Sequence, residues 1–284
     1  MPICGFSLPR IYGGAPLNLV SLGITGRAAM NSYGKLSTAF YDFDKPAAPP
    51  DALTYYLSRA ALSNGPVLEP MCGSGRFLIP LLQAGVPVEG VDASVDMLAA
   101  CRSRADSLGL VPTLYEQSLQ HLSLPHRYDL AFVPSGSLGL IHQTGSLRAC
   151  LGRLRRHLRP NAILLIELVD SQAFGAGSDD LGARSVETGD GGSICYAWRS
   201  TRDWDNGTVC YDGRYQLRQG ETVLAEESEQ LVLKMYASPE FLYELRLAGF
   251  ADARVVPITD DTAWLRESGC SLYECTVPGS NAHD

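Results

Sequence analysis

Short apolar runs alternate with amphipathic segments along most of the chain. Each run has the length of a buried strand. The segments between them carry apolar residues every three or four positions, as in residues 145–158, which predicts helices that bury one face. This alternation predicts an α/β fold built on a doubly wound, mostly parallel, seven-stranded sheet. We expect its strands at residues 66–68, 86–91, 113–117, 128–134, 163–168, 253–257 and 271–277.

A different pattern follows the fifth predicted strand. Residues 175–192 are polar and loop-like. The segments after them alternate apolar and polar positions and are separated by turn signals such as Asp205-Asn206-Gly207, which predicts antiparallel strands. We therefore interpret residues 176–236 as an antiparallel β insertion that covers the active-site edge of a core formed by residues 66–175 and 237–277. We expect the strands of the insertion at residues 193–199, 207–218 and 221–236.

The N-terminal part divides into two stretches. Residues 1–29 show no sustained period and are rich in glycine and proline, so we expect an irregular arm. Residues 30–65 contain a segment rich in aromatic side chains and a predicted helix, and we expect them to form a helical lid. Because the character of the sequence changes at Met30, we hypothesise that the native start is Met30 and that the preceding arm is mobile or arises from an upstream start codon.

The first predicted strand runs directly into a glycine turn. Gly73 and Gly75 allow main chain rather than side chains to face a ligand, and the helix predicted to begin near Gly75 offers free amides to an anion. The next strand ends in Asp92, where a carboxylate can hold the two hydroxyls of a ribose. Methionine does not easily adopt a positive φ, so we expect Met71 to turn with ordinary dihedral angles.

These residues resemble the class I S-adenosylmethionine (SAM)-dependent methyltransferases. In that family the first motif is an acid inside the first strand followed by a glycine-rich loop, and the second strand ends in another acid. Glu69, Gly73, Gly75 and Asp92 match this motif in type and order. The nicotinamide-binding fingerprint fits less well, because it has no acid before the glycines and needs a small residue where Leu78 stands. The resemblance implies a Rossmann-like methyltransferase sheet. The family usually has glycine at the position of Met71.

The resemblance also implies a cofactor and its contacts. The cofactor would be SAM, converted to S-adenosylhomocysteine, with no metal. The glycine loop would approach the methionine half, Asp92 would bind the ribose, and Glu69 would reach the amino end. For Arg76 a surface or inter-helix pairing role stays open, as does core packing for Met97. The implied contacts are Tyr33, Glu69, Gly73, Ser74, Gly75, Arg76, Asp92, Ala93, Met97, Gln117, Ser118 and Pro134.

Three polar residues are candidates for catalysis. Tyr41 lies in a segment that resembles the lid of small-amine and amino-sugar N-methyltransferases, whereas Ser135 and His142 follow the fourth strand, near the edge where parallel sheets bind ligands. His142 or Tyr41 could accept a proton from an amine. The alternatives are packing of the ring for Tyr41 and a helix-start or core position for His142.

Aromatic and basic residues of the insertion are candidates for substrate contact. Packing or surface positions are the alternative for each of them, because alternation does not reveal which face of a strand points inward. The candidates are Trp204, Arg214, Tyr215 and Tyr236.

Composition narrows the choice of partners. A hydrophobic fraction of 45% indicates a folded globular protein. A formal net charge of -8 argues against a nucleic-acid substrate, because proteins that bind nucleic acid carry basic surfaces. Scattered cysteines fit a reducing cytoplasm better than a disulfide framework, and no apolar run approaches the ~20 residues that span a bilayer. We expect a cytoplasmic protein with a small-molecule substrate and no nucleic-acid or membrane partner; a homodimer stays open.

The function that these observations favour is methyl transfer from SAM to a small molecule, with an amine nitrogen favoured by the resemblance. Methylation of a thioether sulfur or of a hydroxyl or carboxylate oxygen is the alternative within this class. A protein or nucleic-acid methyltransferase and a non-catalytic cofactor-binding module are less favoured alternatives.

Overall fold

The computed structural model describes residues 33–171 and 180–279. The predicted arm at residues 1–29 and the proposed start at Met30 lie outside the described residues. Within the described residues, no helix is both long enough and apolar enough to cross a bilayer.

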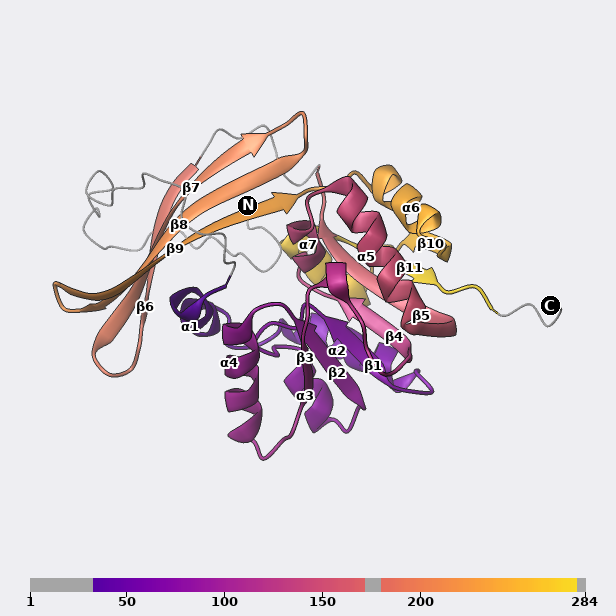
Figure 1. Ribbon diagram of the computed structural model, residues 1–284, viewed down its shortest axis with the longest axis horizontal. Coiled ribbons are helices and arrows are strands. Elements are labelled where there is room, and N and C mark those ends of the chain that lie inside the picture. Colours follow the sequence, from indigo (N-terminus) through magenta and orange to yellow (C-terminus); the bar gives the residue numbers. More distant parts are fainter. Residues whose placement is uncertain (1–32, 172–179, 280–284) are drawn as a thin grey trace.

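Most of the described chain is built around a seven-stranded sheet with the order β10-β11-β5-β4-β1-β2-β3 (Figure 1). Strands β5, β4, β1, β2 and β3 pair in parallel, and β11 runs antiparallel to both of its neighbours. This confirms the predicted doubly wound, mostly parallel sheet. The strands are β1 Val67–Pro70, β2 Val88–Asp92, β3 Thr113–Glu116, β4 Tyr128–Val133, β5 Leu158–Val169, β10 Ala251–Val255 and β11 Cys270–Thr276.

Helices cover both faces of this sheet, which explains why its central strands are apolar on both sides. Tyr56 and Leu78 belong to a buried cluster on one face, and Leu147 and Phe241 to a cluster on the other. Helix α3 begins later than the predicted start near Gly75, because residues 71–77 form turns first. The helices are α2 Pro50–Ala61, α3 Leu78–Gln83, α4 Val95–Asp106, η2 Leu119–His121, η3 Ser137–Leu140, α5 Thr144–Arg156, α6 Ser238–Leu247, η4 Asp260–Thr262 and α7 Trp264–Ser268.

A second sheet of four antiparallel strands follows β5 in the chain and extends to one side of the first sheet (Figure 1). The expectation of a loop at residues 175–192 is wrong over β6, which pairs along its whole length with β7. No residue of β6 is fully buried, so main-chain pairing rather than side-chain burial defines the strand, and its sequence carries no apolar run. The strands are β6 Asp180–Glu187, β7 Gly192–Asp203, β8 Thr208–Gln219 and β9 Thr222–Lys234.

Helix α1 (Lys35–Asp44) connects the two sheets. Its Leu36 and Phe40 pack against Ile194 and Tyr215 of the second sheet, and the helix also contacts α4 of the core. In Figure 1, α1 lies between the second sheet and α4. The amphipathic pattern of α1 is therefore satisfied by the second sheet and not by the core alone.

The N-terminus of α1 is capped from a distant part of the chain. Glu227 of β9 accepts hydrogen bonds from the N–H groups of Leu36 (2.8 Å) and Ser37 (3.0 Å). These N–H groups have no partner within the helix, and no side chain at the N-cap position caps it. A Cβ atom at Gly34 would lie 2.8 Å from the Glu227 carboxylate, so glycine permits this close approach.

Replacing Glu227 with alanine is expected to lower the free energy of unfolding by about 1 kcal/mol, the usual cost of removing a helix N-cap. Urea denaturation followed by circular dichroism measures the change. The control is Glu221→Ala, an exposed carboxylate in the turn between β8 and β9, which should change stability by no more than about 0.5 kcal/mol. Equal stabilities of the two variants would show that Glu227 does not cap α1.

Candidate active site

A cavity of about 550 Å³ lies at the carboxyl ends of β1, β2 and β4 and beside the start of α1. Parallel sheets bind their ligands at this edge. The wall includes every predicted cofactor contact except Ser74 and Gly75, and it also includes Tyr41 and Ser135. The predicted contacts on the wall are Tyr33, Glu69, Gly73, Arg76, Asp92, Ala93, Met97, Gln117, Ser118 and Pro134.

The loop after β1 turns through three left-handed positions. Met71, Gly73 and Gly75 have φ values of 59°, 53° and 81°. The expectation of ordinary dihedral angles at Met71 is therefore wrong. The N–H of Cys72 pairs with the carbonyl of Val91 in the neighbouring strand (3.0 Å), and this pairing fixes the direction of the chain immediately after Met71. The surrounding sheet thus holds a backbone conformation that methionine alone would avoid.

Asp92 holds the glycine loop in place. Its Oδ2 accepts a hydrogen bond from the Gly73 N–H, and its Oδ1 accepts one from the Ser94 N–H, both at 2.8 Å. Burial raises the pKa of Asp92, and these main-chain hydrogen bonds oppose the rise. A carboxylate has about four acceptor sites, so Asp92 can still accept hydrogen bonds from a ligand in the cavity.

Glu69 presents a buried oxygen that lacks a partner. The side chain is 2% exposed, and its Oε2 makes no hydrogen bond within the described residues. Burial raises the pKa of Glu69 well above its usual value, and the Arg76 guanidinium opposes this rise. An unsatisfied buried acceptor costs free energy. A ligand with an ammonium group would remove that cost, so the site fits the amino end of an amino-acid moiety.

Ser74 and Gly75 of the glycine loop contact other parts of the protein and do not line the cavity. The Ser74 hydroxyl donates to Asp42 of α1 and accepts from Arg104 of α4 (3.2 Å). Arg104 also donates to Asp42 at 3.3 Å. A Cβ atom at Gly75 would lie 2.6 Å from the sulfur of Cys101, so glycine allows α4 to pack closely. Both residues therefore fix the position of the loop.

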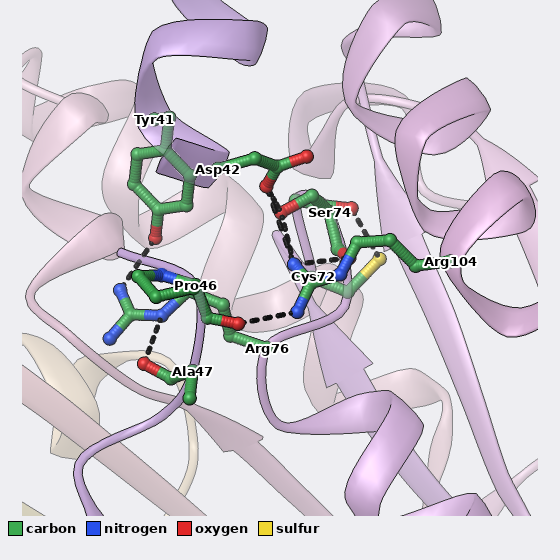
Figure 2. Close-up of polar contacts among 9 residues, drawn as sticks. Tyr41, Asp42, Pro46, Ala47, Cys72, Ser74, Arg76 and Arg104 are labelled. Atoms are coloured by element: carbon green, nitrogen blue, oxygen red, sulfur yellow. Dashed lines mark hydrogen bonds and ion pairs between the residues drawn. The ribbon is translucent and has the colours of Figure 1, made fainter. Parts of the chain in front are cut away.

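Arg76 joins the glycine loop to the lid segment (Figure 2). Its Nη1 donates to the hydroxyl of Tyr41 (2.8 Å) and its Nε donates to the carbonyl of Ala47 (3.2 Å). Arg76 is buried, so the alternative of a surface position is wrong. Because the Tyr41 oxygen accepts from Arg76, its own hydrogen remains available to donate. The Tyr33 ring meets the Tyr41 ring edge to face, with centres 6.0 Å apart.

The pKa of Lys45, which lies beside Tyr41, is strongly shifted. The Lys45 ammonium lies 5.0 Å from the centre of the Tyr41 ring. Burial lowers the pKa of Lys45 to about 7; the negative charge of Asp44 opposes the shift, and Arg76 and Arg184 reinforce it. Asp44 also forms an ion pair with Arg184 of β6. Arg184 of the second sheet therefore adds a positive charge near Asp44 and Lys45.

The loop after β4 brings Ser135, and not His142, to the cavity. Ser135 has a φ of 60°, and its N–H donates to Oε2 of the buried Glu167 at 2.9 Å. Its hydroxyl makes no hydrogen bond to any described residue. His142 is half-buried just before α5, with Nδ1 3.3 Å from the carbonyl oxygen of Leu140. Its placement matches the helix-start alternative.

The four predicted substrate residues of the insertion do not reach the cavity wall. Trp204 is 52% exposed between β7 and β8, and Tyr236 is fully buried and donates to a main-chain carbonyl. Tyr215 packs in the cluster under α1, and Arg214 lies in the middle of β8. Tyr215 lies away from the cavity because α1 packs on this part of the second sheet, where the Tyr215 ring contacts Phe40 of the helix.

Several charged residues behind the cavity wall were not among the residues predicted from the sequence. Glu167 lies inside the apolar run of β5, which is the same signal that marks Glu69 in β1, so it could have been found. Glu227 and Glu229 alternate along β9, but the sequence does not show that their partner is α1. Arg104 stands in an ordinary polar helix pattern and gives no signal.

Comparison with known families gives a match for the central third of the chain. Residues 67–161 match a family model described as a methyltransferase domain. Among curated relatives, a dTDP-3-amino-3,6-dideoxy-alpha-D-glucopyranose N,N-dimethyltransferase of Streptomyces fradiae is 29% identical over 126 residues, which are 44% of this chain and 47% of that protein. A putative methyltransferase of a Geobacillus strain is 23% identical over 164 residues, or 56% and 65% of the two chains. The chain thus spans about half to two thirds of the length of these relatives.

Solved structures match a larger part of the chain. A sugar N-methyltransferase from a Streptoalloteichus species has a TM-score of 0.70 at 19% identity, over 89% of this chain and 97% of that one. An amino pentose methyltransferase from Micromonospora echinaspora, solved with SAM bound, has a TM-score of 0.64 at 21% identity, over 88% and 99% of the two chains. At these identities the likeness is one of fold.

Lys45 is expected to reduce stability at neutral pH. Its pKa falls from 10.5 to about 7 on folding, so between these values the unfolded chain holds a proton that the folded chain releases. Stability is therefore lost as the pH falls from 10.5 toward 7. Lys45→Met should be more stable than the parent at pH 7, and the difference should narrow by about 2 kcal/mol between pH 7 and 9. Urea unfolding at both pH values measures it; a constant difference would contradict the perturbed pKa.

Proposed function

We propose that this chain, whose residues 67–161 are a methyltransferase domain and whose described part has the class I methyltransferase fold, transfers a methyl group from SAM to an amine nitrogen of a small molecule. The observation that carries the proposal is the cavity at the ends of β1, β2 and β4, which combines an acid for a ribose with an unpartnered acid for an ammonium group. The amine acceptor is supported by the sugar N-methyltransferases among the structural neighbours.

We assign the wall residues to the three parts of SAM. Asp92 would accept hydrogen bonds from the ribose hydroxyls, and Glu69 would pair with the ammonium of the methionine moiety. Met97 in the first turn of α4 and Gln117 and Ser118 just after β3 would surround the adenine. The main chain at Gly73 leaves room for close approach of the ligand. All of these residues line the same cavity.

The reaction needs alignment more than acid-base assistance. SAM supplies an electrophilic methyl group on a positively charged sulfur. The residues of the chain then have to hold an amine in line with that carbon and exclude water. Ser135 Oγ is free to accept a hydrogen bond from the acceptor N–H, which would orient the nitrogen lone pair. Tyr41, held by Arg76, can donate its hydroxyl hydrogen to a second polar group of the acceptor.

Charge and composition support the remaining parts of the proposal. The net charge of -8 disfavours a nucleic-acid acceptor, because a polyanion would be repelled. A cavity of about 550 Å³ is of the size that holds small-molecule ligands.

Asp92→Ala and Glu69→Gln should weaken cofactor binding in different ways. Each loses a charged hydrogen bond, which is expected to cost roughly 1 to 3 kcal/mol of binding free energy. Calorimetry with two ligands separates the sites: S-adenosylhomocysteine carries the amino-acid moiety, and 5′-methylthioadenosine lacks it. Asp92→Ala should weaken both ligands, whereas Glu69→Gln should weaken only S-adenosylhomocysteine. If Glu69→Gln weakens both equally, Glu69 does not bind the amino end.

The methyl acceptor can be identified with isotopically labelled SAM. The full chain is incubated with labelled SAM and a panel of amino sugars, free and nucleotide-linked, and with pooled metabolites; mass spectrometry then detects a gain of one labelled methyl. We expect the label on nitrogen, and we expect Ser135→Ala to lower kcat/KM by about tenfold, the effect of losing one orienting contact. His142→Ala should keep the parent rate, since His142 lies outside the cavity wall. Label on oxygen or sulfur alone would contradict the proposed acceptor.

A further inference from the structure

The cavity wall contains residues with an unusual backbone conformation. In the described part of the chain, the residues other than glycine, asparagine and aspartate that have positive φ are Tyr33 (59°), Met71 (59°) and Ser135 (60°). All three line the cavity. Such conformations are costly for ordinary side chains and persist only where the surroundings fix them. The surroundings of Tyr33 and Ser135 therefore matter to the shape of the site.

Ser135 is fixed by a buried carboxylate of β5. The Ser135 N–H donates to Oε2 of Glu167 at 2.9 Å, and the hydroxyl of Tyr56 donates to Oε1 at 2.6 Å. Glu167 is 3% exposed and Tyr56 is fully buried. Tyr56 in turn stacks on Phe132 of β4, with ring centres 4.7 Å apart. We call the group Tyr56, Glu167 and Ser135 the Glu167 clamp.

Tyr33 is fixed in the same way by the second sheet. The Tyr33 N–H donates to Oε1 of Glu229 at 2.6 Å, and the hydroxyl of Tyr215 donates to Oε2 at 3.0 Å. Glu229 is 4% exposed and Tyr215 is 5% exposed. The carbonyl of Tyr33 also accepts a hydrogen bond from the Ser94 hydroxyl at 2.7 Å. We call the group Tyr215, Glu229 and Tyr33 the Glu229 clamp.

The two clamps act on different sides of the cavity. In the order of the sheet, Asp92 ends β2, Glu69 lies in β1, and Ser135 follows β4. The nucleoside side is at β2, so Ser135 lies beyond the methionine side, where an acceptor would approach. Tyr33 is tied instead to Ser94, two residues after Asp92, and so lies on the nucleoside side.

We propose that Glu167 and Glu229 are positioning residues for methyl transfer, the Glu167 clamp setting Ser135 toward the acceptor and the Glu229 clamp setting Tyr33 over the cofactor. This inference rests on the proposed function. Neither carboxylate is part of the cavity wall, so each acts through the main chain that it holds. A charged acceptor makes a strong hydrogen bond to a main-chain N–H, which suits it to hold a left-handed residue.

The first test replaces the carboxylates in the full chain with an apolar side chain of similar size. Glu167→Leu should lower kcat/KM for the acceptor identified by methyl gain about tenfold or more, and should change the Kd of S-adenosylhomocysteine by less than about threefold. Glu229→Leu should raise that Kd about tenfold or more. Hydrogen exchange should accelerate at the amide of Ser135 in the first variant and at that of Tyr33 in the second. If each variant lost affinity for S-adenosylhomocysteine and kcat/KM by the same factor, the proposal would be overturned.

A conservative replacement distinguishes positioning from proton transfer. Glutamine at position 167 keeps one oxygen for the Ser135 N–H, and Tyr56 can rotate its hydroxyl to accept from the amide. Glu167→Gln should therefore retain activity within about threefold of the parent, because an uncharged acceptor still holds the N–H. A loss as large as that of Glu167→Leu would show that the charge itself is required and would overturn the positioning role. If Glu167→Leu does not fold, Tyr56→Phe replaces it and should show the same selective, smaller loss.

A glycine rescue tests the backbone argument directly. Ser135→Gly and Ser135→Ala both lack the hydroxyl, but only glycine adopts positive φ without cost. In the Glu167→Leu background the glycine variant should be several-fold more active than the alanine variant. The reason is that glycine avoids the free-energy cost of holding one residue in a strained backbone conformation. In the parent background the two should be similar. Equal activity in the Glu167→Leu background would overturn the proposal. If the parent transfers no methyl group, the proposed function fails, whereas the exchange and S-adenosylhomocysteine measurements still decide on the clamps.

Discussion

Hydrogen bonds from main-chain amides to carboxylates determine the shape of the cavity. The chain makes left-handed turns at several points of the wall, and a turn of this kind leaves N–H groups without partners in regular secondary structure. Carboxylates from strands of both sheets accept these hydrogen bonds. The pairs are Gly73 with Asp92, Ser135 with Glu167, and Tyr33 with Glu229. Glu227 also accepts hydrogen bonds from the N–H groups of Leu36 and Ser37 at the start of α1. A ligand site lined by main chain therefore depends on acids, some of which never touch the ligand.

This dependence gives the second sheet a structural part in the site. The candidate substrate residues of the insertion lie outside the cavity wall, yet β9 supplies the carboxylates that hold the start of α1. The far end of α1 is held by the core, through Arg104 on Asp42 and Arg76 on Tyr41 (Figure 2). The second sheet holds the start of α1, and α4 and the glycine loop of the core hold its far end. These contacts keep Tyr33 and Tyr41 on the cavity wall. The second sheet thus contributes to the cavity by holding Tyr33 and the start of α1.

The part of the wall around Glu69 and Asp92 could be predicted from sequence because its parts are local. Glu69, Gly73 and Asp92 lie within one strand-loop-helix-strand unit, whose geometry follows from strand pairing and the glycine turn. The backbone at Met71 could not be predicted, since a hydrogen bond from the next residue to β2 fixes it. The inward face of the second sheet could not be predicted either, because alternation gives two equivalent faces and only the packing of α1 distinguishes them.

The positions of the wall residues along the chain indicate which properties relatives should share. The match to the methyltransferase domain covers residues 67–161, the part that carries Glu69, Asp92 and the loop after β4. Tyr33 and Tyr41 on the wall, and Glu167 and Glu229 behind it, all lie outside that match. The two acids proposed to bind the cofactor thus lie in a short continuous segment, whereas Tyr33, Tyr41 and the carboxylates behind the wall meet that segment only in the folded chain. Changes outside the matched segment could alter the parts of the wall that Glu167 and Glu229 hold while leaving Glu69 and Asp92 in place, and these parts of the wall should therefore diverge faster among relatives than the two acids.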